Sequence, residues 1–276
     1  MAPIIDSHQH FWALSTRGHV WPTPDLDAIF RDFGPHDLAE AVMDVPLAKT
    51  VLIQSQPTDA DTDWLLRLAD STPLIGAVVG WCDLDAPTAA DRIAELSRRP
   101  KLRGLRPMLQ AIARTDWLLD VRLTPALSAM QECGLRLDAL VQPRHLPMLA
   151  RFVDRWPDLP IVIDHAAKPY VARGELDPWR AQIAALAERK VYCKLSGLRT
   201  EQSPGQRADD LRPYVEHLIE CFGDRLMWGS DWPVLLLAGD TYRQWFEDAA
   251  QLSALEGPAL GRLFSGAANE FYNLGG

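Results

Sequence analysis

His8 and His10 follow a short apolar run in Ile4-Ile5-Asp6-Ser7-His8-Gln9-His10. Side chains alternate across a β-strand, so we expect both imidazoles to project from one face, near the carboxyl end of the strand. Two neighbouring imidazoles are stable together when a divalent cation, an anionic group or a carboxylate shares their lone pairs. Asp6 has the same parity, and we expect its carboxylate to hold one imidazole in a single tautomer. A plain strand end at the surface is the competing interpretation.

Two further residues with suitable chemistry end apolar runs elsewhere in the chain. His165 ends Ile161-Val162-Ile163-Asp164-His165, and Asp231 ends the run that begins at Leu226. Three imidazoles and a carboxylate at one mouth suit a divalent ion, or a water molecule activated by Asp231. Taken singly, His165 reads as a satisfied core histidine and Asp231 as a helix N-cap. We favour the functional interpretation because all four residues stand at the ends of predicted strands.

The chain that must position these residues alternates between β-branched or apolar runs and helical patterns. The expected strands cover residues 4–12, 50–55, 74–82, 102–106, 135–141, 161–165, 191–196 and 226–231. The expected helices cover residues 35–43, 59–71, 88–98, 123–133, 146–155, 178–189, 211–222, 242–252 and 258–269. Such alternation indicates parallel strands joined by right-handed crossovers. It predicts an α/β fold, a single (β/α)8 TIM-barrel domain over residues 1–276, with residues 14–33 as a packed lid.

Other residues near the predicted strand ends are candidates for contacts with a substrate, because TIM barrels place their sites there. They are Gln54, Trp81, Arg106, Lys194 and Trp232. Lys194 is equally compatible with a salt bridge inside the barrel, and Arg106 with a pair to Asp83 or Asp138. Lys168, just beyond His165, is a further polar residue of this kind, and it is equally compatible with a solvated side chain. Aromatic faces suit the C–H surfaces of a sugar ring, so we expect Trp81 and Trp232, together with Trp12, to form one wall.

Composition narrows the classes of partner. The net charge of −9 argues against nucleic acid, whose affinity for proteins comes largely from Lys and Arg. No apolar run approaches the roughly 20 residues that cross a bilayer, and we expect no signal peptide before the first predicted strand. The four cysteines lie far apart and predict reduced thiols. We therefore expect a cytoplasmic protein that acts on a small molecule, without nucleic-acid or membrane partners; the sequence leaves the oligomeric state open.

Five motifs together resemble the amidohydrolase superfamily. They are Asp-Ser-His-Gln-His-Phe-Trp (6–12), Leu-Arg-Gly-Leu-Arg-Pro (102–107), Ile-Asp-His-Ala-Ala-Lys-Pro (163–169), Lys-Leu-Ser-Gly-Leu (194–198) and Trp-Gly-Ser-Asp-Trp-Pro (228–233). Within the superfamily, the chain is most similar to a lactonase branch that includes sugar-lactone hydrolases and pyrone-dicarboxylate lactonases. The resemblance extends from Ile4 to about Phe271, and the second and fourth motifs are its narrower part.

The resemblance implies that Asp231 takes a proton from the attacking water, with His8, His10 and His165 near the lactone carbonyl or around a metal. The sequence departs from two-metal members at two places. Arg106 stands where those members carry a lysine, and the predicted strand 135–141 contains Asp138 but no histidine. We therefore expect at most one divalent ion, such as zinc, held by His8, His10, His165 and Asp231. The lactonase resemblance implies that activity need not depend on it.

The expected function is hydrolysis of a sugar-derived lactone, similar to L-fucono-1,5-lactone, to its aldonic acid. A lactone expels its alkoxide more easily than an amide expels nitrogen, so a carboxylate base and cationic donors suffice. A pyrone-dicarboxylate would require several arginines, and only Arg103, Arg106 and Arg144 are candidates. A zinc-dependent decarboxylase of the same superfamily is a second alternative. A barrel that binds a sugar acid without turning it over is a third.

Overall fold

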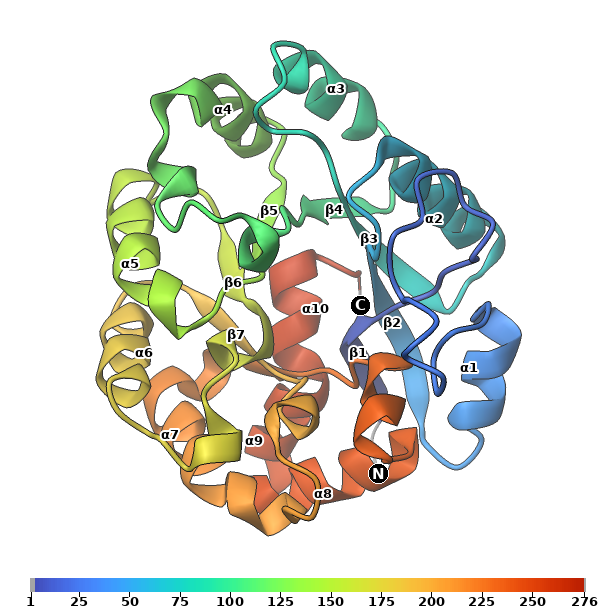
Figure 1. Ribbon diagram of the computed structural model, residues 1–276, viewed down its shortest axis with the longest axis vertical. Helices are drawn as coiled ribbons and strands as arrows, with labels where there is room; N and C mark the ends of the chain where they lie inside the picture. Colours follow the sequence, from blue (N-terminus) through green and yellow to red (C-terminus); the bar gives the residue numbers. More distant parts are fainter. Residues whose placement is uncertain (1–2, 276) are drawn as a thin grey trace.

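Eight parallel strands follow one another around a barrel in the order in which they occur along the chain (Figure 1). The computed structural model describes residues 3–275. The strands are β1 (Ile4–Gln9), β2 (Leu47–Ile53), β3 (Ile75–Gly80), β4 (Leu102–Leu105), β5 (Arg136–Ala139), β6 (Ile161–Ile163), β7 (Tyr192–Leu195) and β8 (Leu226–Trp228). A bridge between Gln9 and Trp232 joins the segment after β8 to β1. The predicted TIM barrel is confirmed.

Helices surround the barrel and alternate with its strands, as predicted. They are α1 (Pro35–Ala41), α2 (Asp59–Ser71), α3 (Ala89–Leu96), α4 (Thr124–Glu132), α5 (Leu146–Arg155), α6 (Trp179–Ala187), α7 (Arg212–Phe222), α8 (Tyr242–Ser253), α9 (Gly257–Gly261) and α10 (Ala267–Tyr272). The predicted helix 258–269 is interrupted by a π-helical turn, Arg262–Gly266. Among the residues that the structure describes, no helix is long and apolar enough to span a bilayer.

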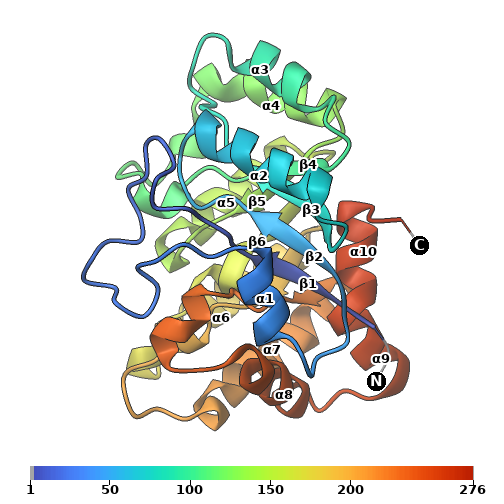
Figure 2. The same cartoon turned by 90° about the vertical axis from the view of Figure 1, so that its right-hand side faces the viewer.

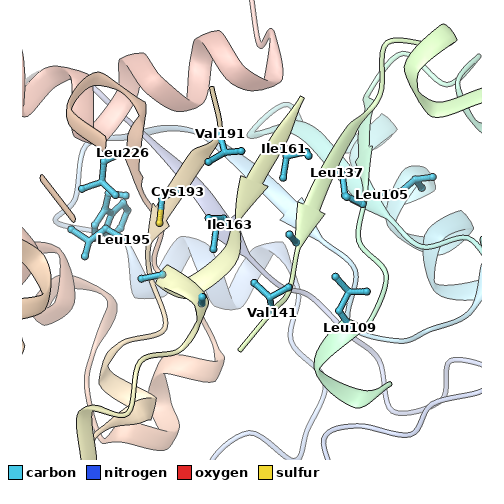
Figure 3. Packing of buried hydrophobic residues seen from close by; sticks show 14 of the residues in the cluster. Leu105, Leu109, Leu137, Val141, Ile161, Ile163, Val191, Cys193, Leu195 and Leu226 are labelled. Atoms are coloured by element: carbon cyan, nitrogen blue, oxygen red, sulfur yellow. The ribbon is translucent and has the colours of Figure 1, made fainter. Parts of the chain in front are cut away.

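Two apolar clusters stabilise the barrel. The larger one fills the space between strands and outer helices, and Leu137, Ile161 and Val191 belong to its part along β5 to β7 (Figure 3). The smaller one brings alternate strand residues, such as Ile53, against Phe271 of α10. Burial of each large apolar side chain contributes about 1.5–3 kcal/mol. The strands are therefore covered on both faces, which explains their near-continuous apolar character.

The two ends of the barrel are closed differently. Helix α10 lies at one end, on the side opposite the long loop of residues 14–33 (Figure 2). That loop contains neither helix nor regular strand, and it is anchored by the buried Gln56, whose Oε1 accepts hydrogen bonds from the Val20 and Trp21 amides at 2.9 and 3.3 Å. The ring of Trp21 packs edge-on against Trp12, 5.2 Å between centroids. The loop is thus packed as predicted.

A buried carboxylate supports the chain that holds this loop. Asp61, in the first turn of α2, accepts hydrogen bonds from the Ser55 and Gln56 amides at 3.0 and 3.1 Å. Burial raises the pKa of Asp61 to about 6, although these two hydrogen bonds oppose the rise. The ends of β2 and the N-terminal loop are therefore fixed by one acidic residue.

Candidate active site

A cavity of about 500 Å³ opens among the loops that follow the carboxyl ends of the strands. Four of the predicted residues line it, namely His10, Arg106, His165 and Asp231. Its other lining residues are Val20, Trp21, Ser55, Pro57, Met108, Gln110, Ala111, Leu140, Lys168, Thr200, Glu201, Val234 and Leu237. Polar and charged groups thus share the cavity with a broad apolar wall.

His8, His10 and Asp231 bring their side chains together beside this cavity. The Nε2 atoms of His8 and His10 lie 3.1 Å apart. Asp231 Oδ1 lies 3.4 Å from Nε2 of His10 and 3.7 Å from Nε2 of His8. Within residues 3–275, these three are the group whose potential ligand atoms all fall within 4.8 Å of one another. The structure therefore brings the predicted histidine pair and carboxylate to one point.

The geometry of this trio fits a small divalent cation. His10 Nδ1 lies 2.9 Å from the Ile53 carbonyl, so it donates its proton there and leaves an Nε2 lone pair directed at His8 and Asp231. Tetrahedral zinc with bonds of about 2.0–2.1 Å separates its ligand atoms by about 3.3 Å, close to the observed spacings. Two cations, Arg106 and Lys194, contact His8, and their charge weakens the affinity for any further cation.

His165 approaches the same point from the loop after β6. Its ring centroid lies 4.4 Å from that of His8, and its Nε2 lies 3.9 Å from Asp231 Oδ1. Its Nδ1 lies 2.9 Å from the Ser196 hydroxyl, which orients the ring. All three predicted imidazoles thus meet the carboxylate. His165 nevertheless lies outside the compact group of His8, His10 and Asp231.

The backbone at His165 differs from the prediction. Strand β6 ends at Ile163, and residues 165–168 all adopt the left-handed region, with φ of 51°, 50°, 61° and 53°. Each non-glycine residue in this region costs roughly 1 kcal/mol, and such strain collects at functional sites. A Cβ on the neighbouring Gly197 would lie 2.5 Å from His165 Nδ1. Glycine at 197 therefore allows the imidazole to occupy its position.

Asp231 is held in place by its backbone and does not cap a helix. Its amide donates to the His8 carbonyl at 2.8 Å, and its φ is 55°. The hydroxyl that accepts from the Trp232 amide, at 2.9 Å, belongs to Ser230. The N-cap interpretation of Asp231 is therefore wrong. A Cβ on Gly229 would lie 2.7 Å from Cβ of His8, so the absence of a side chain there lets the two strand ends approach.

Lys194 lies in a fully buried ion-pair network beneath the cavity. Its Nζ lies 2.5 Å from Asp138 Oδ2 and 2.9 Å from Asp164 Oδ1, and all three side chains have no exposed surface. The same ammonium lies 3.2 Å from Nδ1 of His8. From α10, the Tyr272 hydroxyl donates to Asp138 Oδ2 at 2.6 Å. Of the two interpretations of Lys194, the structure favours the salt bridge inside the barrel.

Arg106 lies between the cavity and this network. Its guanidinium donates to the Gln54 carbonyl, and one of its terminal nitrogens lies 3.4 Å from His8 Nε2 and 3.6 Å from Asp164 Oδ2. Its acidic neighbour is therefore Asp164 and not Asp83 or Asp138. Asp164 was not singled out from the sequence, although it precedes His165 directly.

The surroundings fix the charge of the site. Burial lowers the pKa of His8, His10 and His165, and the charge of Lys194 lowers that of His8 further. Burial alone would raise the pKa of Asp231, but His165 and His10 outweigh it and hold that pKa below its ordinary value. Near neutral pH, an ionised carboxylate therefore faces neutral imidazoles.

Several predicted substrate contacts do not lie at the cavity. Gln54 is fully buried and donates from its Nε2 to the Arg106 carbonyl at 2.9 Å. Trp232 is 3% exposed and packs against Phe11 and Phe33. Trp81, Trp232, Gln54 and Lys194 are not among the lining residues of the cavity. The aromatic residue that lines it is Trp21, from the N-terminal loop.

The position of Asp6 also differs from the prediction. Its carboxylate accepts hydrogen bonds from the His8 amide at 3.0 Å, the Ser230 hydroxyl at 2.6 Å and the Tyr242 hydroxyl at 2.9 Å. It therefore fixes the backbone of β1 to the segment after β8, and not the tautomer of an imidazole.

Comparisons with known proteins find relatives that match nearly the whole chain. A family model described as amidohydrolase matches residues 5–274. An L-fucono-1,5-lactonase of Burkholderia ambifaria is 48% identical over 98% of this chain and 95% of its own. An L-fucono-1,5-lactonase of Burkholderia multivorans is 37% identical over 95% of each chain. A crystal structure of a Burkholderia multivorans amidohydrolase with bound zinc superposes with a TM-score of 0.91, at 36% identity over 99% of this chain and 100% of that one.

Proposed function

Because this chain belongs to the amidohydrolase family, we propose that it is an enzyme that hydrolyses a sugar-derived lactone, L-fucono-1,5-lactone or a close aldonolactone, to the aldonic acid. The observation that carries the proposal is the meeting of an ionised Asp231 with His10 and His165 at a cavity of about 500 Å³. A carboxylate base beside a neutral imidazole donor, here His165, is what hydrolysis of an activated ester requires.

In the proposed reaction, the Asp231 carboxylate takes a proton from a water molecule while that water attacks the lactone carbonyl. We assign the Ser196 hydroxyl, 2.9 Å from Nδ1 of His165, as the donor of that hydrogen bond, so that the Nε2–H of His165 faces the cavity and donates to the developing oxyanion. Arg106 supplies positive charge on the same side. The bond between the carbonyl carbon and the ring oxygen then breaks, and Asp231 returns its proton to that oxygen, which becomes the free hydroxyl of the aldonic acid.

A divalent ion on His8, His10 and Asp231 would polarise the lactone carbonyl and lower the pKa of a bound water. The contacts that orient the trio are independent of the ion. His10 stays oriented by the Ile53 carbonyl, and Asp231 stays fixed by its amide contact to β1.

The cavity favours a neutral lactone over a dicarboxylate. Of Arg103, Arg106 and Arg144, only Arg106 lines the cavity. Arg103 donates to the Pro100 carbonyl, and Arg144 to the Gln110 carbonyl. One arginine against an apolar wall suits a ring with hydroxyls better than two carboxylates.

The test is proton release from a panel of aldonolactones, measured with and without a chelator. We expect hydrolysis well above the spontaneous rate for L-fucono-1,5-lactone and a loss of it in Asp231→Asn. Rates equal to the spontaneous rate for every lactone would overturn the proposal. Carbon dioxide release from an aryl acid would instead indicate a decarboxylase, and binding of the aldonic acid without turnover a non-catalytic barrel.

A further inference from the structure

Lys168 and Glu201 form a charged pair in the wall of the cavity, apart from the proposed catalytic residues. Lys168 Nζ donates to Glu201 Oε1 at 2.8 Å, and the two side chains are 20% and 25% exposed. Over residues 3–275, this is the only side-chain hydrogen bond or ion pair that the structure gives to either group. An ammonium carries three hydrogens and a carboxylate about four lone-pair sites, so both groups retain capacity for a ligand.

Lys168 lines the cavity in a backbone conformation that is unfavourable for a residue with a side chain. Lys168 ends the run of four left-handed residues that begins at His165, and its φ is 53°. Glycine would remove the conformational cost at this position but would also remove the side chain. The same strained turn therefore presents both His165 and Lys168 to the cavity.

Glu201 is fixed from the loop after β7. It ends the short 3-10 helix Arg199–Glu201, in which Arg199 pairs with Asp240 and the Thr200 hydroxyl donates to the Gly197 carbonyl at 2.9 Å. Gly197 is the residue that packs against His165. Lys168 and Glu201 thus belong to the two loops, after β6 and β7, that position His165, the proposed oxyanion donor.

Much of the remaining wall is apolar, formed by residues such as Val20, Trp21, Met108, Leu140 and Leu237. A sugar lactone that enters this cavity must exchange the hydration of its hydroxyls for protein partners, because an unpaired buried hydroxyl is costly. Besides Asp231, Glu201 is the one carboxylate among the lining residues. A donor and an acceptor side by side match two neighbouring hydroxyls, of which one accepts from the ammonium and the other donates to the carboxylate.

We propose that Lys168 and Glu201 together bind two adjacent hydroxyls of the lactone and thereby make the enzyme selective for polyhydroxylated lactones over lactones without hydroxyls. This inference rests on the proposed function and assigns its specificity to a pair outside the catalytic group.

The test compares kcat and KM for L-fucono-1,5-lactone and for δ-valerolactone, which has the same ring size and no hydroxyls. The variants are Glu201→Gln, Lys168→Met and the double variant, and thermal unfolding checks that each is folded. Hydrogen bonds to charged groups predict that the ratio of the two kcat/KM values falls by about 10- to 100-fold in each single variant, mainly through KM for the sugar lactone. The double variant should lose less than the product of the two, because both groups hold one diol.

A matched control is Glu247→Gln, which breaks an exposed ion pair with Arg243 on α8 and should leave the ratio unchanged. A fall of kcat/KM that is equal for both lactones, or an unchanged ratio, would overturn the assignment of the pair while the lactonase function stands. If the unmodified enzyme opens neither lactone, both proposals fail. Should Lys168→Met not fold, Glu201→Gln decides alone, because it keeps the size and shape of the side chain.

Discussion

The amide of Asp231 donates a hydrogen bond of 2.8 Å to the carbonyl of His8, so the proposed general base is fastened to the strand that carries the histidine pair. The contact crosses the seam between β8 and β1. It places the Asp231 carboxylate within 3.7 Å of both Nε2 atoms, and any shift of one strand end displaces the other.

Replacing Asp231 by Asn should reduce kcat by a factor on the order of 10³ and leave the fold intact. The amide keeps the shape of the carboxylate but cannot accept the proton of water. Asn also tolerates the left-handed backbone at this position, where φ is 55°. Steady-state kinetics with thermal unfolding of both proteins measures the effect, and undiminished turnover would assign the proton transfer to another group.

Zinc should raise the thermal midpoint of the unmodified protein by a few degrees and should fail to do so in His10→Asn. Binding to the folded state alone stabilises by RT ln(1 + [Zn]/Kd), about 1.4–2.7 kcal/mol at 10 to 100 times Kd. His36→Asn is the matched control, because the side chain of His36 is 87% exposed and lies on α1, outside the trio. Elemental analysis after gel filtration independently measures the zinc bound per protein molecule. Equal zinc retention in the unmodified protein and both variants would contradict the assignment of His10 as a ligand.

Lys194→Met should destabilise the protein by about 3–5 kcal/mol, because it leaves Asp138 and Asp164 buried without their shared cation. Lys190→Met, at an exposed position, should change the free energy of unfolding by less than about 0.5 kcal/mol. Adding Asp138→Asn to Lys194→Met should restore part of the loss. Denaturant unfolding of the four proteins measures these differences, and equal stabilities for the two lysine variants would show that the network contributes nothing.

Asp61 should make stability depend on pH between about pH 4 and pH 6. Its pKa is about 6 in the folded protein and 3.8 in a free side chain, so the folded state binds more protons in this window. Its contribution is greatest below the lower value and is lost as the pH rises through the higher one. Asp61→Asn has no such charge, so its stability relative to the unmodified protein should rise by about 2–3 kcal/mol between pH 4 and pH 7. An equal difference in the free energy of unfolding between Asp61→Asn and the unmodified protein at pH 4 and at pH 7 would refute this.

Much of the barrel could be predicted because its signals are local. The helices 59–71 and 146–155 were predicted with the bounds that the structure gives, since amphipathic patterns and proline mark their ends. Strand ends were less accurate. The run 161–165 reads as one strand, but β6 ends at Ile163, because the turn that carries His165 is left-handed without any glycine to signal it.

The proximity of His8, His10, His165 and Asp231 could be predicted because all four lie at or just after the ends of strands that share one end of the barrel. The ion-pair partners of Lys194 could not, since Asp138 and Asp164 come from β5 and the loop after β6, and the Tyr272 hydroxyl that binds Asp138 comes from α10. Lys168 and Glu201 carry no periodic signal, and only their loops bring them together.

The seam between the first and last strands also sets when the cavity can exist. The Ser230 hydroxyl and the His8 carbonyl that meet there are separated by 222 residues. A chain still emerging from the ribosome must therefore wait for β8 before any reactive centre can assemble, whatever helices have already formed. The site can therefore assemble only late in synthesis. Two fragments divided anywhere between β1 and β8 would regain activity only by associating with each other.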